Sequence, residues 1–105
     1  MNLEKHIESQ RVWSKRTFGD GPRTEGILKH IEAEMREVRE HPEDLFEWID
    51  IVILALDGAW RAGHSPYDIA LALQTKMLKN INRTWPKPVS QDEPVMHIKE
   101  QPNEV

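Results

Sequence analysis

The longest apolar run of the chain covers residues 51–56 and reads IVILAL. It is far too short to cross a bilayer, so we expect no membrane span and no membrane partner. In a helix, this run is apolar nearly all round and must be covered on every side. A chain of 105 residues buries only a modest core. The cover therefore includes a second subunit, and we predict a homo-oligomer, either a dimer or a tetramer.

Glycine and proline divide the sequence into four segments whose apolar residues recur at helical steps of three and four. No segment alternates every second residue as a half-buried strand does. Pro42 is predicted to open the third helix, Gly63 to follow its end, and Ser65 to cap the fourth. The fold class is therefore all-α, with a four-helix bundle-like architecture. The expected helices cover about residues 3–16, 24–40, 42–61 and 66–82.

The domain organisation is simple, because the sequence contains neither an internal repeat nor a separate linker. We predict one all-α domain over residues 1–86. Residues 87–105 are rich in proline and have little apolar periodicity. Such a segment is typical of an extended or disordered tail.

The composition restricts the possible location and partners of the protein. The chain has no cysteine, and its amino-terminal residues contain no apolar signal-peptide core. These features favour a cytoplasmic location. The formal net charge of −4 disfavours nucleic-acid binding, which depends on clustered lysine and arginine. A small anionic ligand remains compatible with this charge, because a metal ion can mediate the contact.

The sequence contains two acidic pairs beside apolar helix faces. In each pair the two residues are three positions apart. Glu34 and Glu37 form an E-x-x-E pair, and Glu47 and Asp50 form an E-x-x-D pair that leads into the apolar run. Their helices are joined by a short turn, so we expect antiparallel packing that brings the four carboxylates together. Like charges repel in a partly dry site unless cations separate them. Oxygen ligands indicate Mg²⁺, with Mn²⁺ as a possible substitute. Each acidic pair alone would be ordinary on a solvated helix.

Cations and aromatic residues form two candidate sites for an anionic ligand. Cations and an amide gather at the end of the fourth helix, where they suit a phosphate chain but also stabilise a helix carboxyl end. Aromatic residues flank a glycine loop, where they could stack on a base or simply join the core. The candidate binding residues are Trp13, Phe18, Gly19, Lys76, Lys79, Asn80 and Arg83.

The order of these motifs resembles the MazG-like all-α nucleoside triphosphate pyrophosphohydrolases. The similarity is strongest to their small dATP/dGTP diphosphohydrolase (MazZ-like) branch, which phages often encode. It rests on WSKRTFGDGPRTEGILKHIEAEMREV, EWIDIVILALDGAWRAGHSP and KMLKNINRTWP, within residues 13–86. The superfamily pattern often reads E-E-x-x-E, and Ala33 replaces its first glutamate.

The resemblance implies a hydrolase that splits a purine dNTP into dNMP and pyrophosphate with Mg²⁺. It assigns metal binding and catalysis to Glu34, Glu37, Glu47 and Asp50, and phosphate binding to the four polar residues near the end of the fourth helix. Either Glu37 or Glu34 is the general base. Two alternatives stay open: a pyrimidine dNTP (dUTP or dCTP) pyrophosphatase, and a non-catalytic helical dimer that binds nucleotides or a partner. The expected setting is the cytoplasm of a bacterium or a phage-infected host.

Overall fold

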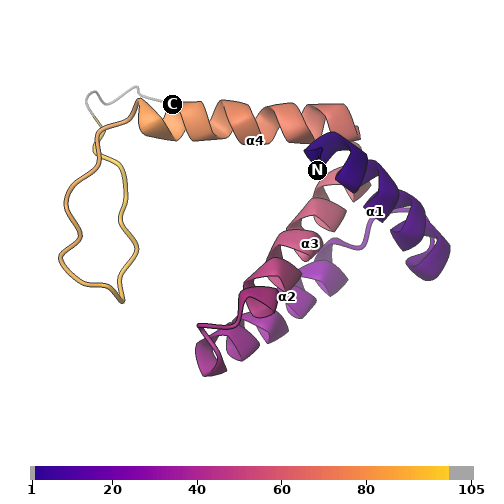
Figure 1. The fold of residues 1–105 in the computed structure, drawn as a ribbon, viewed down its shortest axis with the longest axis horizontal. Coiled ribbons are helices and arrows are strands. Elements are labelled where there is room, and N and C mark those ends of the chain that lie inside the picture. Colours follow the sequence, from indigo (N-terminus) through magenta and orange to yellow (C-terminus); the bar gives the residue numbers. More distant parts are fainter. Residues whose placement is uncertain (1, 100–105) are drawn as a thin grey trace. The chain divides into compact units, whose positions relative to one another are not determined.

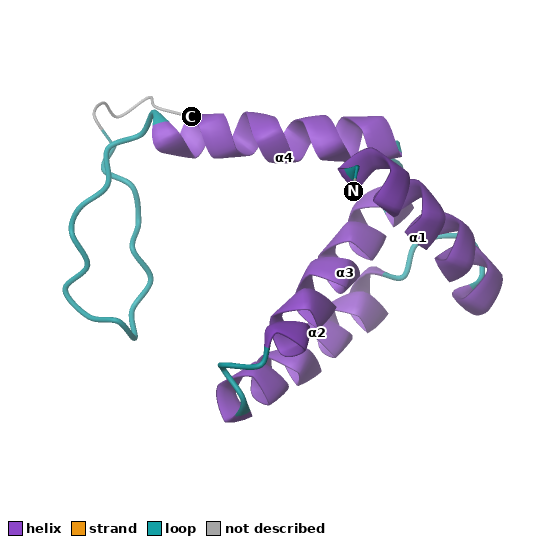
Figure 2. Cartoon of the chain, viewed as in Figure 1, coloured by secondary structure: helices purple, strands orange, loops and turns teal. Residues whose placement is uncertain are grey.

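The computed structural model describes residues 2–99, and four helices account for most of them. The helices are α1 (Leu3–Phe18), α2 (Thr24–Glu40), α3 (Leu45–Arg61) and α4 (Pro66–Ile81), with loops between them (Figure 2). No strand forms between residues 2 and 99, where one isolated bridge pairs Thr84 with Ile98. The prediction of an all-α fold is confirmed. None of the described helices is long and apolar enough to cross a membrane.

The chain separates into two compact units, and the boundary between them falls inside α4. The first unit is Met1–Leu71 and the second is Ala72–Val105. Within the first unit, α2 and α3 run side by side as an antiparallel hairpin, and α1 also contacts α3 (Figure 1). Gly58 lies at the hairpin interface, where an added Cβ would come within 3.8 Å of the Ile27 side chain. An added Cβ would thus make an ordinary van der Waals contact, so the packing of the two helices does not require glycine at this position.

The core of the first unit is small. Ile7, Trp60 and Ile69 form its buried cluster, and the partly buried Leu3 and Leu56 pack against them. This cluster joins α1, α3 and the first turn of α4. The apolar run of α3 is less covered than a central helix requires, since Val52 remains 49% exposed. The first unit thus has a core of the modest size expected from its length.

The turn between α2 and α3 differs from the prediction that Pro42 opens the third helix. Pro42 lies in the turn, and its carbonyl accepts a 2.9 Å hydrogen bond from the indole of Trp48. Asp44 is the N-cap, because its carboxylate accepts from the Phe46 amide at 2.9 Å, so α3 begins at Leu45. An aspartate side chain satisfies an unpaired amide of the first turn, which a proline ring cannot do. Glu47 is thereby placed in the first turn of α3.

The fourth helix begins as the sequence indicates. The Ser65 hydroxyl accepts a hydrogen bond from the Asp68 amide at 3.1 Å, and Gly63 takes a φ of 107° just before it. After α4, residues 82–99 contain no helix. The Ile98 amide donates to the Thr84 carbonyl at 2.7 Å, so this segment of the second unit folds back on itself. The predicted domain limits, 1–86 and 87–105, remain a prediction, and residues 100–105 lie outside the described part.

Candidate functional site

Three of the four predicted carboxylates lie close together on the α2–α3 hairpin. Ligand oxygens of Glu34, Glu47 and Asp50 all lie within 4.8 Å of one another. Glu34 and Glu47 are half-buried, whereas Asp50 is exposed. Three carboxylates at this separation match the hard oxygen ligands that Mg²⁺ and Mn²⁺ prefer. The donor set therefore fits a divalent cation.

Glu47 is surrounded by negative charges of its neighbours. The pKa of Glu47 is raised above its ordinary value of 4.5, first by loss of solvent and then by the negative charges of Glu37, Asp44, Glu34 and Asp50. Glu37 does not belong to the group of three ligands, but its charge is the largest of the electrostatic causes. Repulsion of this kind is relieved either by a proton or by a cation. The arrangement thus favours a bound cation at neutral pH.

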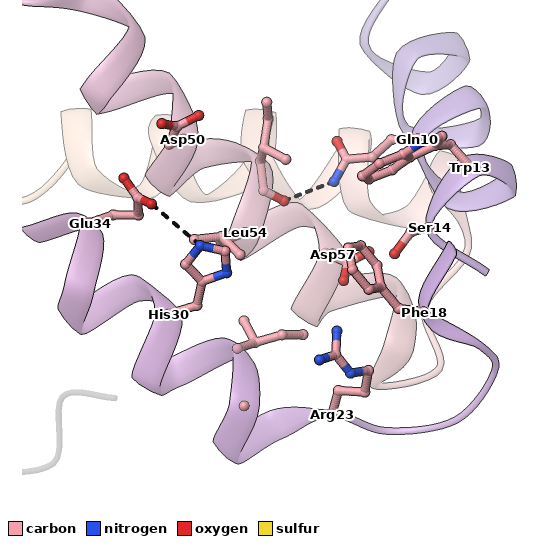
Figure 3. Close-up of a pocket in the computed structure, with 13 residues that line it drawn as sticks. Gln10, Trp13, Ser14, Phe18, Arg23, His30, Glu34, Asp50, Leu54 and Asp57 are labelled. Carbon is pink, nitrogen blue, oxygen red and sulfur yellow. Dashed lines mark hydrogen bonds and ion pairs between the residues drawn. The ribbon is translucent and has the colours of Figure 1, made fainter. Parts of the chain in front are cut away.

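A cavity of about 250 Å³ opens directly beside the acidic group. Glu34 and Asp50 belong to its lining, together with residues of α1, α2 and α3. Figure 3 shows these two carboxylates at one end of the cavity and Trp13 and Phe18 near the other. A ligand that occupied the cavity would therefore contact aromatic side chains at one end and a charged group at the other.

The aromatic wall contains two of the predicted ligand-binding residues. The rings of Trp13 and Phe18 meet edge to face with their centroids 5.5 Å apart. The guanidinium of Arg23 lies 5.0 Å from the centroid of the Phe18 ring. Trp13 is 53% exposed, so the structure does not support the alternative that it is a simple core residue. Both rings can offer apolar surface to a planar ligand.

Two further polar side chains line the cavity. His30 Nε2 lies 3.3 Å from a carboxylate oxygen of Glu34 and lines the cavity. Gln10 donates from Nε2 to the Ile53 carbonyl at 2.8 Å (Figure 3). Its Oε1 pairs with His6 Nε2 at 3.0 Å. Both side chains are thus held in place by neighbouring groups. His30 in particular can orient the carboxylate beside it.

Sequence reasoning missed the role of Asp57 and Arg61. Arg61 Nε donates to the Asp57 carboxylate at 3.0 Å, and the pair is buried with side-chain exposures of 1% and 9%. The indole of Trp60 donates to the other oxygen of Asp57 at 2.8 Å. Asp57 also lines the cavity. Their i, i+4 spacing is the only sequence signal for this pair.

The predicted phosphate-binding residues all belong to the second unit. In that unit, the Asn80 carbonyl accepts from the Trp85 indole at 2.7 Å and from the Arg83 amide at 3.2 Å. Lys76 and Lys79 are exposed. Trp85 therefore caps the end of α4. The assignment of Lys76, Lys79, Asn80 and Arg83 to phosphate remains a prediction, as does the role of Gly19.

Comparison with known proteins identifies the family of the chain. The chain is 44% identical over 94 residues to the Eaa protein of Salmonella phage P22, an alignment that covers 89% of this chain. The alignment covers 29% of that phage protein. No solved structure matches the chain significantly. A profile of the dATP/dGTP pyrophosphohydrolases matches residues 6–104. The chain therefore belongs to the dATP/dGTP pyrophosphohydrolase family.

Proposed function

We propose that the protein is a Mg²⁺-dependent pyrophosphohydrolase that converts a purine deoxynucleoside triphosphate, dATP or dGTP, to the monophosphate and pyrophosphate. This activity is supported by the position of the acidic group next to an aromatic cavity. The ligand oxygens of Glu34, Glu47 and Asp50 lie within 4.8 Å of one another, and two of these residues line an aromatic cavity. A nucleotide has a planar apolar base joined to a highly charged phosphate chain. The site offers a matching surface to each part.

The carboxylates serve the phosphate end. Glu34, Glu47 and Asp50 would hold the cation, with Glu37 close enough to add its charge to the group. When bound, Mg²⁺ would neutralise phosphate charge and lower the pKa of water. Glu34 or Glu37 would accept the proton from the water that attacks the α-phosphorus, the bond between the α-phosphorus and its bridging oxygen would break, and pyrophosphate would leave. His30, 3.3 Å from Glu34, restricts the orientation of that carboxylate.

The cavity serves the base. Trp13 and Phe18 flank the space, and the amide of Gln10 lies among its lining residues. A buried polar group of a binding site discriminates among bases, because the wrong base leaves the hydrogen bonds of that group unmade. Lys76, Lys79, Asn80 and Arg83 are proposed to bind the phosphate chain. A cytoplasmic location is part of the same proposal, because deoxynucleotides occur there.

We also propose that the protein works as a homo-oligomer. The first half of α3 exposes a run of large apolar side chains, among them Phe46 at 76%, Leu45 at 66% and Trp48 at 51%. Large exposed apolar side chains gathered in one helix segment favour an interaction surface. Light scattering should give a mass of two or more chains for the wild type and a lower mass for Phe46→Glu. A wild-type monomer at micromolar concentration would contradict the proposal.

The test of the activity is pyrophosphate release with Mg²⁺ from dATP, dGTP, dCTP, dTTP and dUTP. We expect the purine nucleotides to turn over fastest and chelation of the metal to stop the reaction. Glu47→Gln and Asp50→Asn should be inactive, whereas Glu32→Gln, an exposed glutamate on α2, should retain activity. The proposal fails if no nucleotide is hydrolysed or if both acidic variants keep full activity. Preference for a pyrimidine nucleotide would replace the substrate but retain the mechanism.

A further inference from the structure

Arg61 lies at the end of α3 and is bonded at every donor it has. An arginine side chain carries five N–H donors. Nε donates to Asp57, Nη1 donates to the carbonyls of Gly19 at 3.0 Å and Gly21 at 2.9 Å, and Nη2 donates to the hydroxyl of Ser14 at 2.9 Å and its carbonyl at 3.3 Å. The side chain is 1% exposed. Arg61 therefore has no donor left for a phosphate, although its type and position would suggest one.

The acceptors of Arg61 define what it holds. Gly19 and Gly21 belong to the loop between α1 and α2, and both have positive φ values, 85° and 92°. Glycine permits this conformation but does not enforce it, because its backbone is free to adopt many others. The guanidinium fixes both carbonyls at once and ties them to Ser14 of α1. The conformation of the loop thus depends on a side chain 40 or more positions away in the sequence.

The loop in turn places part of the cavity wall. Phe18 immediately precedes Gly19, and Arg23 follows the loop, 5.0 Å from the centroid of the Phe18 ring. Both residues line the cavity, and Trp13 meets Phe18 edge to face. Phe18 is 49% exposed, so packing alone holds it loosely. Movement of the loop would displace this wall without moving the acidic group on α2 and α3.

We propose that Arg61, together with Asp57 and Ser14, is a positioning residue for base binding. This inference rests on the proposed function. Asp57 orients the guanidinium through a bond to Nε, and the guanidinium then sets the loop that carries Phe18 and Arg23. Asp57 follows Asp50 by seven residues, about two turns of α3. The network is therefore separate from the cation ligands, and it acts on nucleotide affinity.

The test separates base binding from metal binding. Arg61→Lys supplies one point charge and three donors in place of the planar fork, so it cannot reach all five acceptors. We expect its KM for dATP and dGTP to rise about fivefold to tenfold, the factor that corresponds to the net loss of about one hydrogen bond. The kcat should stay within about twofold, and the affinity for Mn²⁺ without nucleotide should be unchanged, because no cation ligand is altered.

Two further variants complete the experiment. Ser14→Ala removes one of the five bonds and leaves the fold intact, so it should raise KM in the same direction by a smaller factor. Arg11→Lys is the matched control, because Arg11 is also bonded to a carboxylate, that of Glu8 at 2.7 Å, but outside the cavity wall. Its KM should not change. Wild-type turnover tests the proposed function independently. An unchanged KM in folded Arg61→Lys and Ser14→Ala, or a parallel loss of Mn²⁺ affinity, would overturn the positioning role.

Discussion

The pair formed by Asp57 and Arg61 is expected to be among the most sensitive contacts for stability. Arg61→Met keeps most of the apolar stem but removes five hydrogen bonds and leaves the Asp57 carboxylate, 9% exposed, without its partner. Loss of one member of a buried ion pair costs about 3–5 kcal/mol. Small domains are stable by only about 5–15 kcal/mol. A single substitution at Arg61 should therefore remove a large fraction of the free energy of unfolding.

A double-mutant cycle tests whether the pair is the cause. Asp57→Asn leaves the guanidinium without its carboxylate partner, and adding Arg61→Met to it should cost less than Arg61→Met alone, with a coupling energy of about 1–3 kcal/mol. Urea unfolding followed by far-UV circular dichroism, at one fixed protein concentration, measures all four proteins. The exposed pair Arg11 and Glu8, with exposures of 30% and 49%, is the reference cycle. It should give a coupling below about 1 kcal/mol.

Additive effects of the two substitutions on the free energy of unfolding would refute this prediction. If the effects of Asp57→Asn and Arg61→Met add to within about 0.5 kcal/mol, the two side chains act independently despite their 3.0 Å contact. A coupling no larger than that of the Arg11–Glu8 reference would lead to the same conclusion. Either outcome would mean that the hydrogen bonds of Arg61 to the loop, and not its charge, carry the effect.

The remaining predictions concern Glu47 and the glycines. Because the pKa of Glu47 is raised, this group stabilises the metal-free fold below its ordinary pKa of 4.5 and loses that contribution as the pH rises through the raised value. Metal-free Glu47→Gln should thus melt at or above the wild-type temperature at neutral pH, yet gain no stability from Mg²⁺; a lower metal-free melting temperature contradicts this. Gly63→Ala should destabilise the fold by about 1 kcal/mol in urea unfolding, because its φ is 107°. Gly26→Ala, inside α2 with its nearest contact at 3.8 Å, should be neutral or stabilising, and an equal loss in both would argue against backbone strain at Gly63.

Much of the fold follows from local features that the sequence displays directly. Helical apolar spacing, the cap at Ser65 and the glycine at position 63 are signals whose physical effect acts within a few residues. These signals predicted four helices and no strands, and they placed the ends of α2 and the start of α4 closely. The error at Pro42 arose where two local signals competed, and the aspartate cap two residues later prevailed.

The candidate site divides in the same way. Spacing along two helices joined by a short turn was enough to bring Glu34, Glu47 and Asp50 together, because an antiparallel hairpin leaves few other arrangements. The register of that hairpin, which leaves Glu37 outside the group of three, is set by side-chain packing between α2 and α3. The spacing of residues along the sequence does not predict this register.

The sequence by itself determined the all-α fold class, the positions where helices begin and end, and which charged residues lie near the apolar run. What only the tertiary structure decided was how those residues are used. The sequence does not reveal the partners of Arg61, and in the folded chain all of its donors are bonded to Asp57, Ser14 and the glycine loop. The physical reason is that a guanidinium bonds to the acceptors that the fold brings close to it. Its acceptors in α1 and the loop lie 40 to 47 positions away in the sequence, beyond the reach of any local pattern.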